Sequence, residues 1–321
     1  MYISYSGYKS NEQCPLSYWH RYVNKTVLTA PDNGVNALYG IIIGTVFEIF
    51  YRDRIWKHVN YVDKLQDLVE PVYLESTKPQ KGRIIDWGDE RSNYASKEAL
   101  LVDVRDSIPR GIDTIRRNRL VGRYAEAEVK LDTKFGEHLI GGRADFLIQR
   151  VAPDGDLVLL DGKGSKHRDK YVDGHAKKAG KQVEGVQLKW YAFLHRAKLN
   201  RVPDQLGYIF WRFDGDAAME WIPFTKFDLD QLQHEVLSTV DRVSGSIQRL
   251  AKVSGKAQEH SELLQELFPA QPGWHCSLCS YLPVCEEGSK KVASIQNQQR
   301  KPRPTIPQSG VLEDGLSLDE E

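Results

Sequence analysis

The sequence is poor in sulfur and has no excess of either charge. It holds four cysteines and two methionines in 321 residues. Lys plus Arg equals Asp plus Glu, at 44 each, so any nucleic-acid surface must be a local patch rather than a global field. No run approaches the ~18 apolar residues of a membrane-spanning helix. The opening MYISYSGYKS also lacks the basic and apolar regions of a signal peptide. These absences predict a cytoplasmic protein.

The few cysteines are distributed unevenly. Cys276, Cys279 and Cys285 lie together in WHCSLCSYLPVC, whereas Cys14 stands alone near the start of the chain. In a reducing compartment such clustering favours metal or cluster ligation over disulfides. Three interpretations stay open from the residues alone, namely buried structural thiols, a Cys₄ zinc site and an iron–sulfur cluster. Structural zinc sites commonly bring ligands in close pairs, so the isolated Cys14 favours the cluster over zinc.

Hydrophobic periodicity predicts an α/β or α+β fold, because strands and helices interleave in the second half of the chain. The predicted helices cover Tyr8 to Val23, 35–56, the vicinities of 96–106 and 111–120, 182–199 and 226–252. The predicted strands lie at 126–132, within 138–151 and 154–164, and at 206–213. From Gly288 onward the chain is polar, Pro-bearing and segregated in charge, which predicts a disordered tail.

The stretch GGRADFLIQRVAPDGDLVLLDGKGSK carries the strongest chemical signal. Asp145 lies on one predicted strand, and Asp161 ends the next strand after a loop of hairpin length. Side chains two apart in an extended chain share a face, so Asp161 and Lys163 project together, and strand pairing brings Asp145 beside them. Two carboxylates and a backbone carbonyl form an oxygen pocket suited to Mg²⁺ or Mn²⁺. Taken alone, D-x-K is more often a strand-end turn with surface charges. A P-loop is excluded, because its first glycine would fall on Leu157.

Two further features converge on this stretch. Gln187 and Tyr191 are four apart on a predicted helix and therefore share one face, although a core Tyr beside a rim Gln is the commoner arrangement. Glu48, in GTVFEIF, interrupts an otherwise apolar helical stretch. A carboxylate there is costly unless it is paired or binds a metal, and a position at the solvent edge of the helix is an equal alternative.

A basic segment, KGSKHRDKYVDGHAKKAGKQ at 163–182, directly follows the predicted site. Most charge runs are solvated faces, but this position favours a surface that tracks phosphates. The predicted DNA contacts are Lys166, Arg168, Lys170, Lys177, Lys178 and Lys181. The aromatic residues Trp190, Tyr191, Trp211 and Phe213 are candidates for base stacking, with core packing the commoner role for such rings.

The order of these motifs resembles the RecB-like branch of the PD-(D/E)XK nucleases. It runs from Gly44–Glu48 through Asp145, Asp161-Gly-Lys163 and Gln187-x-x-x-Tyr191, framed by Cys14 and the C-terminal cysteines. More narrowly it is similar to members with an iron–sulfur staple, the exonucleases of CRISPR adaptation (the Cas-four family) and AddB-type nuclease domains. The likeness runs from about residue 3 to 287, and SYSGYKSNEQCPLSYWHRYV matches the opening of that family.

This resemblance implies a restriction-endonuclease-like core, a central mixed sheet flanked by helices, with a cysteine cap joining the two ends of the chain. It implies that Asp145 and Asp161 bind the metal, with the Gly162 carbonyl as a further ligand, and that Lys163 is the catalytic lysine. Gln187-x-x-x-Tyr191 would support the site and contact DNA. The four cysteines would hold a [4Fe–4S] cluster.

Two positions depart from the family pattern. Glu48 stands where the family often has His, and Asp161 where many members have Glu. A carboxylate at position 48 still suits a divalent metal, so Glu48 is expected to be a third ligand. The change leaves metal preference and level of activity open.

The expected function is that of a metal-dependent DNA exonuclease on single-stranded or end-containing DNA, in recombination, repair, phage DNA metabolism or CRISPR adaptation. Two alternatives keep the fold, a weak or inactive DNA-binding or assembly factor and a structure-specific endonuclease. Residues 1–287 are expected to form one nuclease domain, with internal divisions after 30, 125 and 225, and 288–321 the tail. The acidic end, LEDGLSLDEE, is either a docking segment for a protein partner or a solvated tail.

Overall fold

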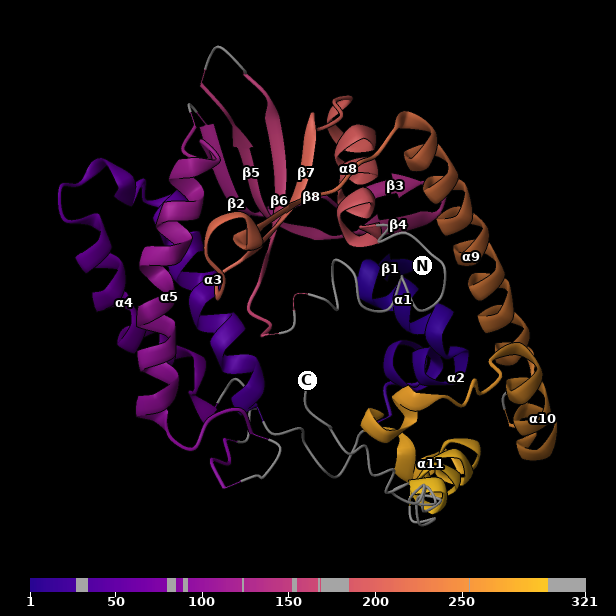
Figure 1. Cartoon of the computed structure of the whole chain (residues 1–321). Helices are drawn as coiled ribbons and strands as arrows, with labels where there is room; N and C mark the ends of the chain where they lie inside the picture. Colours follow the sequence, from indigo (N-terminus) through magenta and orange to yellow (C-terminus); the bar gives the residue numbers. More distant parts are fainter. Residues whose placement is uncertain are drawn as a thin grey trace, which may run out of the picture.

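A mixed five-stranded sheet lies at the centre of the protein (Figure 1). The computed structural model describes residues 1–26, 34–79, 85–88, 92–122, 124–151, 155–166, 168, 185–253 and 255–299. The strand order is β2 (Tyr124–Lys130), β5 (Arg143–Gln149), β6 (Leu157–Lys163), β7 (Gln205–Phe210) and β8 (Met219–Trp221). Among the described strands of this sheet, β6 and β7 pair in parallel and the other neighbours pair antiparallel. The predicted α/β class and mixed sheet are confirmed.

Helices cover both faces of this sheet (Figure 1). On one side lie α3 (Val35–Arg52), α4 (Tyr61–Ser76) and α5 (Lys97–Arg117), and on the other α8 (Val186–Leu199) and α9 (Lys226–Lys252). The strands supply both cores because alternate side chains point to opposite faces. Phe146 and Leu160 pack with α3 and α5, whereas Leu147 and Leu159 pack with α8 and α9.

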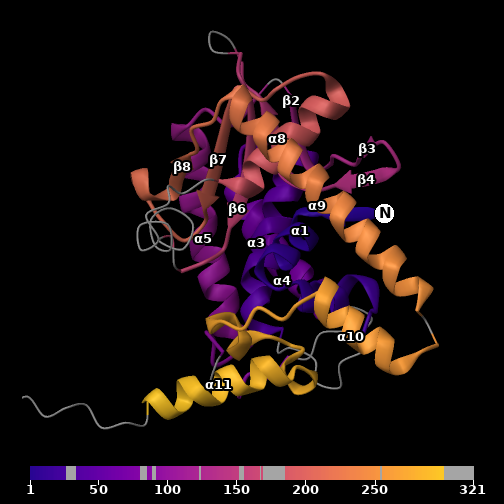
Figure 2. The same cartoon turned by 90° about the vertical axis from the view of Figure 1, so that its right-hand side faces the viewer.

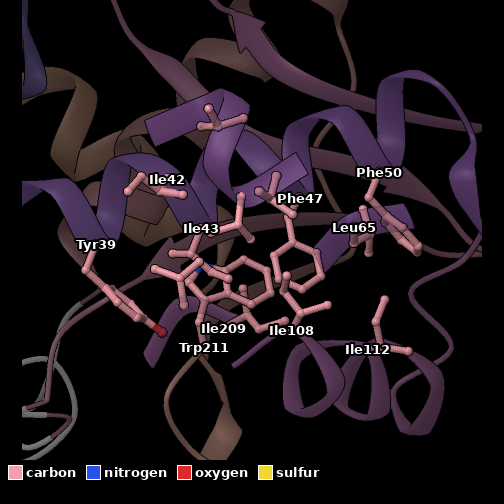
Figure 3. Packing of buried hydrophobic residues seen from close by; sticks show 14 of the residues in the cluster. Tyr39, Ile42, Ile43, Phe47, Phe50, Leu65, Ile108, Ile112, Ile209 and Trp211 are labelled. Carbon is pink, nitrogen blue, oxygen red and sulfur yellow. The ribbon is translucent and has the colours of Figure 1, made fainter. Parts of the chain in front are cut away.

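A stacked pair of aromatic rings lies among the aliphatic side chains of the core beneath α3 (Figure 3). The ring centroids of Phe47 and Trp211 lie 4.1 Å apart, and the angle between the ring planes is 5°. Gly111 of α5 permits this approach, because a Cβ atom there would lie 2.5 Å from Cζ of Phe47. Trp211 follows β7 directly, so this packing ties the end of that strand to α3 and α5.

The N-terminal segment forms a small sheet and a helical layer. β1 (Tyr2–Ser4) pairs in parallel with β4 (His138–Gly141), which pairs with β3 (Thr133–Phe135). The side chain of Ser4 caps α1 (Tyr5–Gln13), and α2 (Pro15–Tyr18) and a π-helical turn (Trp19–Val23) follow.

The C-terminal segment lies beyond α1 and α2. It contains α10 (Ala257–Leu267), two 3₁₀ turns (Trp274–Leu278 and Leu282–Val284) and α11 (Glu286–Gln299). Figures 1 and 2 both show α1 and α2 between the central sheet and α11. The N-terminal helices and the C-terminal segment therefore lie side by side on one side of the molecule.

Several predicted elements were right in place and length, and others were wrong. The helix predicted over 226–252 is confirmed by α9. The two helices predicted near 96–106 and 111–120 are instead the single helix α5, which contains Pro109. The 16-residue helix α4 was not predicted within its charged stretch.

The prediction of a disordered tail from Gly288 was wrong for residues 288–299, which belong to α11. Lys290 forms ion pairs with Glu286 at 2.8 Å and Glu287 at 3.2 Å, and α11 packs on the 3₁₀ turns before it. Residues 300–321 lie outside the described residues. Within the described part of the chain, every helix is too short or too polar to cross a membrane.

Candidate active site

The β5–β6 hairpin brings the buried Asp161 and the partly buried Asp145 together. Phe146 is opposite Leu160, and the same antiparallel register carried one residue further sets Asp145 opposite Asp161. The ladder stops there, and the Gly162 N–H donates instead to Oδ2 of Asp145 at 2.7 Å. Asp161 is only 2% exposed. The hairpin predicted from the sequence is therefore confirmed, and it places both carboxylates in one site.

Gln187 joins these groups from α8. Its Nε2 donates to Oδ1 of Asp161 and to the Tyr191 hydroxyl, both at 2.9 Å. Its Oε1 accepts from Nζ of Lys163 at 3.0 Å, and the same ammonium forms an ion pair with Asp161. The predicted shared face of Gln187 and Tyr191 is confirmed, and that face points at the aspartates.

Burial disfavours the ionised forms of Asp145, Asp161 and Tyr191 unless another charge compensates them. The pKa of Asp145 is raised by desolvation first and then by the charge of Asp161, while the Gly162 N–H and Lys163 oppose the shift. Desolvation also raises the pKa of Asp161, against the lowering effect of Lys163. The pKa of Tyr191 is raised for the same two reasons, burial and then the charge of Asp161. A cation at the aspartates would relieve all three.

The donor set fits a hard divalent cation. Oδ2 of Asp161 is buried and, among the described residues, has no hydrogen bond of ordinary geometry, although the Lys163 ammonium lies against it as an ion pair. Such an oxygen beside a second carboxylate matches the oxygen ligands that Mg²⁺ and Mn²⁺ prefer. Across the described ranges, no three His, Cys, Asp or Glu side chains are already arranged to hold a single metal ion.

The carboxylate of Glu48 contacts other residues than the two aspartates. Its carboxylate pairs with Arg52 at 3.2 Å on α3, and its charge also acts on Arg143. The helix predicted around Glu48 is confirmed by α3, and the carboxylate is partly exposed and paired with Arg52 rather than with the aspartates.

Glu128 borders the site and was not predicted. Its neighbours Ala127 and Val129 pair with Phe146 and Ala144, which leaves Glu128 across from Asp145 without a ladder pair of its own, and its charge raises the pKa of that aspartate. Its backbone has φ 55°, a left-handed conformation that is unfavourable for a residue with a side chain, and its carboxylate pairs with Arg143 at 2.9 Å. The sequence EAEVK shows which residues alternate, but not that Glu128 faces Asp145, because that depends on strand register.

The first basic side chains after Lys163 contact an aromatic ring and a carboxylate. Nζ of Lys166 lies 5.3 Å from the ring centroid of Tyr94, and Arg168 pairs with Glu220 at 2.6 Å. The other predicted DNA contacts, Lys170, Lys177, Lys178 and Lys181, lie outside the described residues. The rings of Trp190 and Trp211 are buried in the core, at 0% and 2% exposure, so the core role holds for them rather than base stacking.

The four cysteines line one cavity of about 470 Å³, between the N-terminal helices and the C-terminal turns. The Gly273 N–H points to Sγ of Cys276 and the Gly288 N–H to Sγ of Cys285, each at 3.3 Å. Burial raises the pKa of the Cys285 thiol, and the three other cysteines add to the shift. The four cysteines thus share one cavity, but among the described residues no three of them are arranged to hold a single metal ion. Gln187 of the aspartate site lines the same cavity.

Comparisons with solved structures give distant likenesses. A protein named "Putative exonuclease" from Eubacterium rectale is 14% identical, with 75% of this chain and 79% of that chain covered and a TM-score of 0.43. A structure named SSO0001 is 10% identical, with 88% of this chain and 95% of that chain covered and a TM-score of 0.27. No curated protein matches the sequence.

The sequence itself matches one family model over nearly the whole described length. The model is that of the PD-(D/E)XK nuclease superfamily, and the match spans residues 2–286. It therefore includes the β5–β6 hairpin with its two aspartates, Lys163, Gln187 and all four cysteines. The chain belongs to the PD-(D/E)XK nuclease superfamily.

Proposed function

We propose that this nuclease is a Mg²⁺- or Mn²⁺-dependent deoxyribonuclease that degrades single-stranded or end-containing DNA as an exonuclease. The observation that carries the proposal is the hydrogen-bonded group of Asp145, Asp161, Lys163 and Gln187. It combines one buried and one partly buried carboxylate, which together favour a cation, with a lysine held beside them. A divalent ion and a cationic side chain beside a phosphate promote hydrolysis of a phosphodiester bond.

In this proposal Asp145 and Asp161 hold the divalent ion, with the Gly162 carbonyl as a further ligand. When bound, the ion polarises the phosphate and lowers the pKa of an attacking water. Glu48 is proposed as an additional ligand, which requires its carboxylate to leave Arg52.

The protein's own groups set the geometry of the reaction. Lys163 presents its ammonium beside the carboxylates and stabilises negative charge on the phosphate oxygens. Gln187 holds that ammonium through Oε1 and Asp161 through Nε2, and the Tyr191 hydroxyl accepts a hydrogen bond from the same Nε2 and so fixes the amide. The Gly162 N–H holds Asp145. Each reacting group is therefore fixed by a second one.

We propose a [4Fe–4S] cluster at Cys14, Cys276, Cys279 and Cys285. The support is the shared cavity and the backbone N–H groups directed at two of the sulfurs. The cluster would join the two ends of the chain as a structural clasp. Iron and acid-labile sulfide measured in anaerobically purified protein, against zinc, test this. Cys285→Ser should lose the metal, and sulfide-free protein with zinc bound would contradict the cluster.

The basic segment is proposed as the DNA surface. Lys166 and Arg168 begin this segment within a few residues of Lys163, so a strand whose phosphate lies at Lys163 passes along them. An exonuclease needs a free end, whereas an endonuclease does not. The comparison is therefore between a linear single strand and a covalently closed circular single strand. Exonuclease action predicts cleavage of the linear strand alone.

The first experiment is degradation of end-labelled single-stranded DNA with Mn²⁺ by wild type, Lys163→Ala and Lys189→Ala. Lys189 is a matched control, since it is a partly buried lysine of α8 whose Nζ lies 3.7 Å from Asp228. We expect Lys163→Ala to lower the rate about 100-fold or more and Lys189→Ala to have little effect. If wild type and Lys163→Ala are both inert but bind DNA, the chain is a binding scaffold rather than a nuclease.

A further inference from the structure

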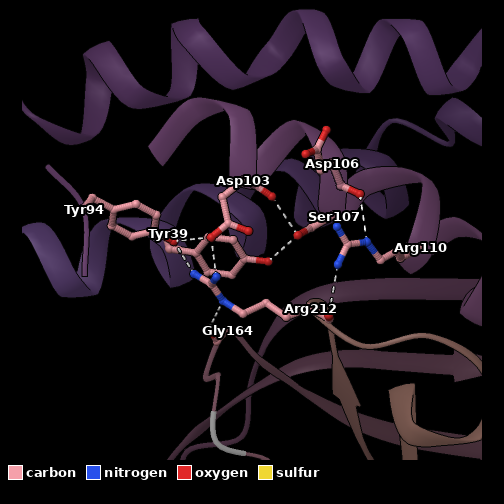
Figure 4. Close-up of polar contacts among 8 residues, drawn as sticks. All are labelled: Tyr39, Tyr94, Asp103, Asp106, Ser107, Arg110, Gly164 and Arg212. Atoms are coloured by element: carbon pink, nitrogen blue, oxygen red, sulfur yellow. Dashed lines mark hydrogen bonds and ion pairs between the residues drawn. The ribbon is translucent and has the colours of Figure 1, made fainter. Parts of the chain in front are cut away.

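Arg212 forms a buried network just beyond the candidate site (Figure 4). Its side chain is 9% exposed, and its guanidinium pairs with the Asp103 carboxylate and donates to the Tyr94 hydroxyl. The guanidinium also lies over the Tyr39 ring, with Cζ 3.4 Å from the ring centroid. Its remaining nitrogen, Nε, donates to the Gly164 carbonyl at 2.7 Å. All three nitrogens of Arg212 are therefore used, and one of them holds the residue after Lys163.

The partners of Arg212 are fixed in turn by α5. The Tyr94 hydroxyl donates to Oδ2 of Asp103 at 2.6 Å. The Tyr39 hydroxyl donates to Oγ of Ser107 at 2.7 Å, and Nη1 of Arg110 donates to the Arg212 carbonyl at 3.1 Å. A buried polar network with its groups satisfied is rigid. The network thus connects α5, which is outside the sheet, to the end of β6.

The backbone on both sides of Lys163 is closely packed. A Cβ atom on Gly164 would lie 2.8 Å from Cδ1 of Tyr39 and 3.0 Å from Cα of Gly40. The backbone N–H of Trp211 donates to the Lys163 carbonyl at 3.2 Å. On the side of β5, however, the paired register ends at Phe146 and Leu160, before Lys163 is reached. The lysine is therefore held by β7 on one edge and by Arg212 through the next residue.

We propose that Arg212 is a positioning residue for Lys163, acting through the Gly164 carbonyl. The inference rests on the proposed nuclease function. Lysine has a long flexible side chain, so the place of its ammonium depends on a fixed backbone beneath it. The same network places Tyr94 under Lys166, so it sets the direction in which the basic segment leaves the site. Only arginine has a planar fork that reaches a carbonyl, a carboxylate and a hydroxyl at once.

The test compares four variants by the kcat and KM of DNA degradation with Mn²⁺ and by melting temperature. Arg212→Lys keeps the charge but loses the fork. The double variant Arg212→Met/Asp103→Asn removes both charges, so no buried carboxylate is left unpaired. Asp103→Asn alone keeps the bond from Arg212 to Gly164. The matched control is Arg196→Met, which removes a partly buried ion pair to Asp230 at 2.7 Å, on the other face of the sheet.

We expect both Arg212 variants to lower kcat about 10- to 100-fold, with KM changed less than about 3-fold, because a displacement near 1 Å costs about this much. Asp103→Asn and Arg196→Met should keep kcat within about 3-fold of wild type. Unchanged kcat in the Arg212 variants, an effect on KM alone, or an equal loss in Asp103→Asn would overturn the proposal. Loss of fold in both Arg212 variants would assign Arg212 a purely structural role and overturn it as well. Failure of the proposed function looks different, since wild type would then be inert or Lys163→Ala as active as wild type.

Discussion

Gly162 offers the sharpest test of how packing behind the site controls its chemistry. A Cβ atom at this position would lie 2.7 Å from Nε1, 2.9 Å from Cζ2 and 3.0 Å from Cε2 of Trp211. The indole cannot retreat easily, because it stacks on Phe47 at 4.1 Å and meets Phe146 edge-on at 6.1 Å. In Gly162→Ala the backbone of β6 must therefore move instead. We expect a loss of about 1–3 kcal/mol in the free energy of unfolding, the usual cost of overpacking a core.

The same movement should impair activity more than stability. It displaces the N–H that holds Asp145 and the lysine that follows, so the rate of DNA degradation should fall about 100-fold. Replacing the obstacle should restore part of this loss. Gly162→Ala/Trp211→Phe removes the indole atoms nearest the new methyl group, and we expect at least about a 10-fold recovery relative to Gly162→Ala, which is a non-additive effect between residues in contact.

The assays are chemical denaturation and initial rates on end-labelled DNA. Gly245→Ala is the control, since a Cβ atom there meets no atom within 4 Å in the middle of α9. It should keep full activity and gain about 0.5–1 kcal/mol of stability. Wild-type activity in Gly162→Ala would refute the steric argument. A double variant whose activity is only the product of the two single losses would refute the role of Trp211.

Three further predictions concern stability. In metal-free protein the raised pKa of Asp145 means that folding favours its protonated form, so its contribution is fully present below about pH 4 and declines as the pH rises. Between about pH 5 and pH 8 in EDTA, the melting temperature of wild type should therefore fall more than that of Asp145→Asn. Equal decreases in the two melting temperatures would contradict this. Tyr51→Phe removes a buried hydrogen bond to the Leu120 carbonyl and should cost about 1–3 kcal/mol in urea unfolding. Ser4→Ala removes the cap of α1 and should cost about 1 kcal/mol, measured in the same way; a loss below about 0.3 kcal/mol would show that the cap is dispensable.

Local rules in the sequence determined the elements that carry the site. Alternation of apolar residues and a turn of hairpin length were enough to place Asp145 and Asp161 on neighbouring strands. The helical spacing of Gln187 and Tyr191 was enough to put both on one face. These features depend on periods of two and 3.6 residues, which any reader of the chain can count.

Local rules failed where packing overrides them. Pro109 and Gly111 suggest a break between two helices, yet α5 continues through both. Gly111 is tolerated because Phe47 occupies the space of its missing side chain, and α5 is buried along that face. The polar residues after Gly288 form α11 because the 3₁₀ turns of the C-terminal segment offer a surface for it. In both cases packing against another segment supplies the free energy that the helical sequence itself lacks, from the remote α3 for α5 and from the neighbouring turns for α11.

The sequence by itself determined the chemical types present and their order, including the lone cysteine at one end and three at the other. Only the tertiary structure decided which of them meet. It brought the four thiols to one cavity, set Glu128 opposite Asp145, paired Glu48 with Arg52, and joined Arg212 to Gly164 across 48 residues. The physical reason is that strand register and the packing of helices on a sheet depend on contacts between remote residues, and no local period encodes those contacts.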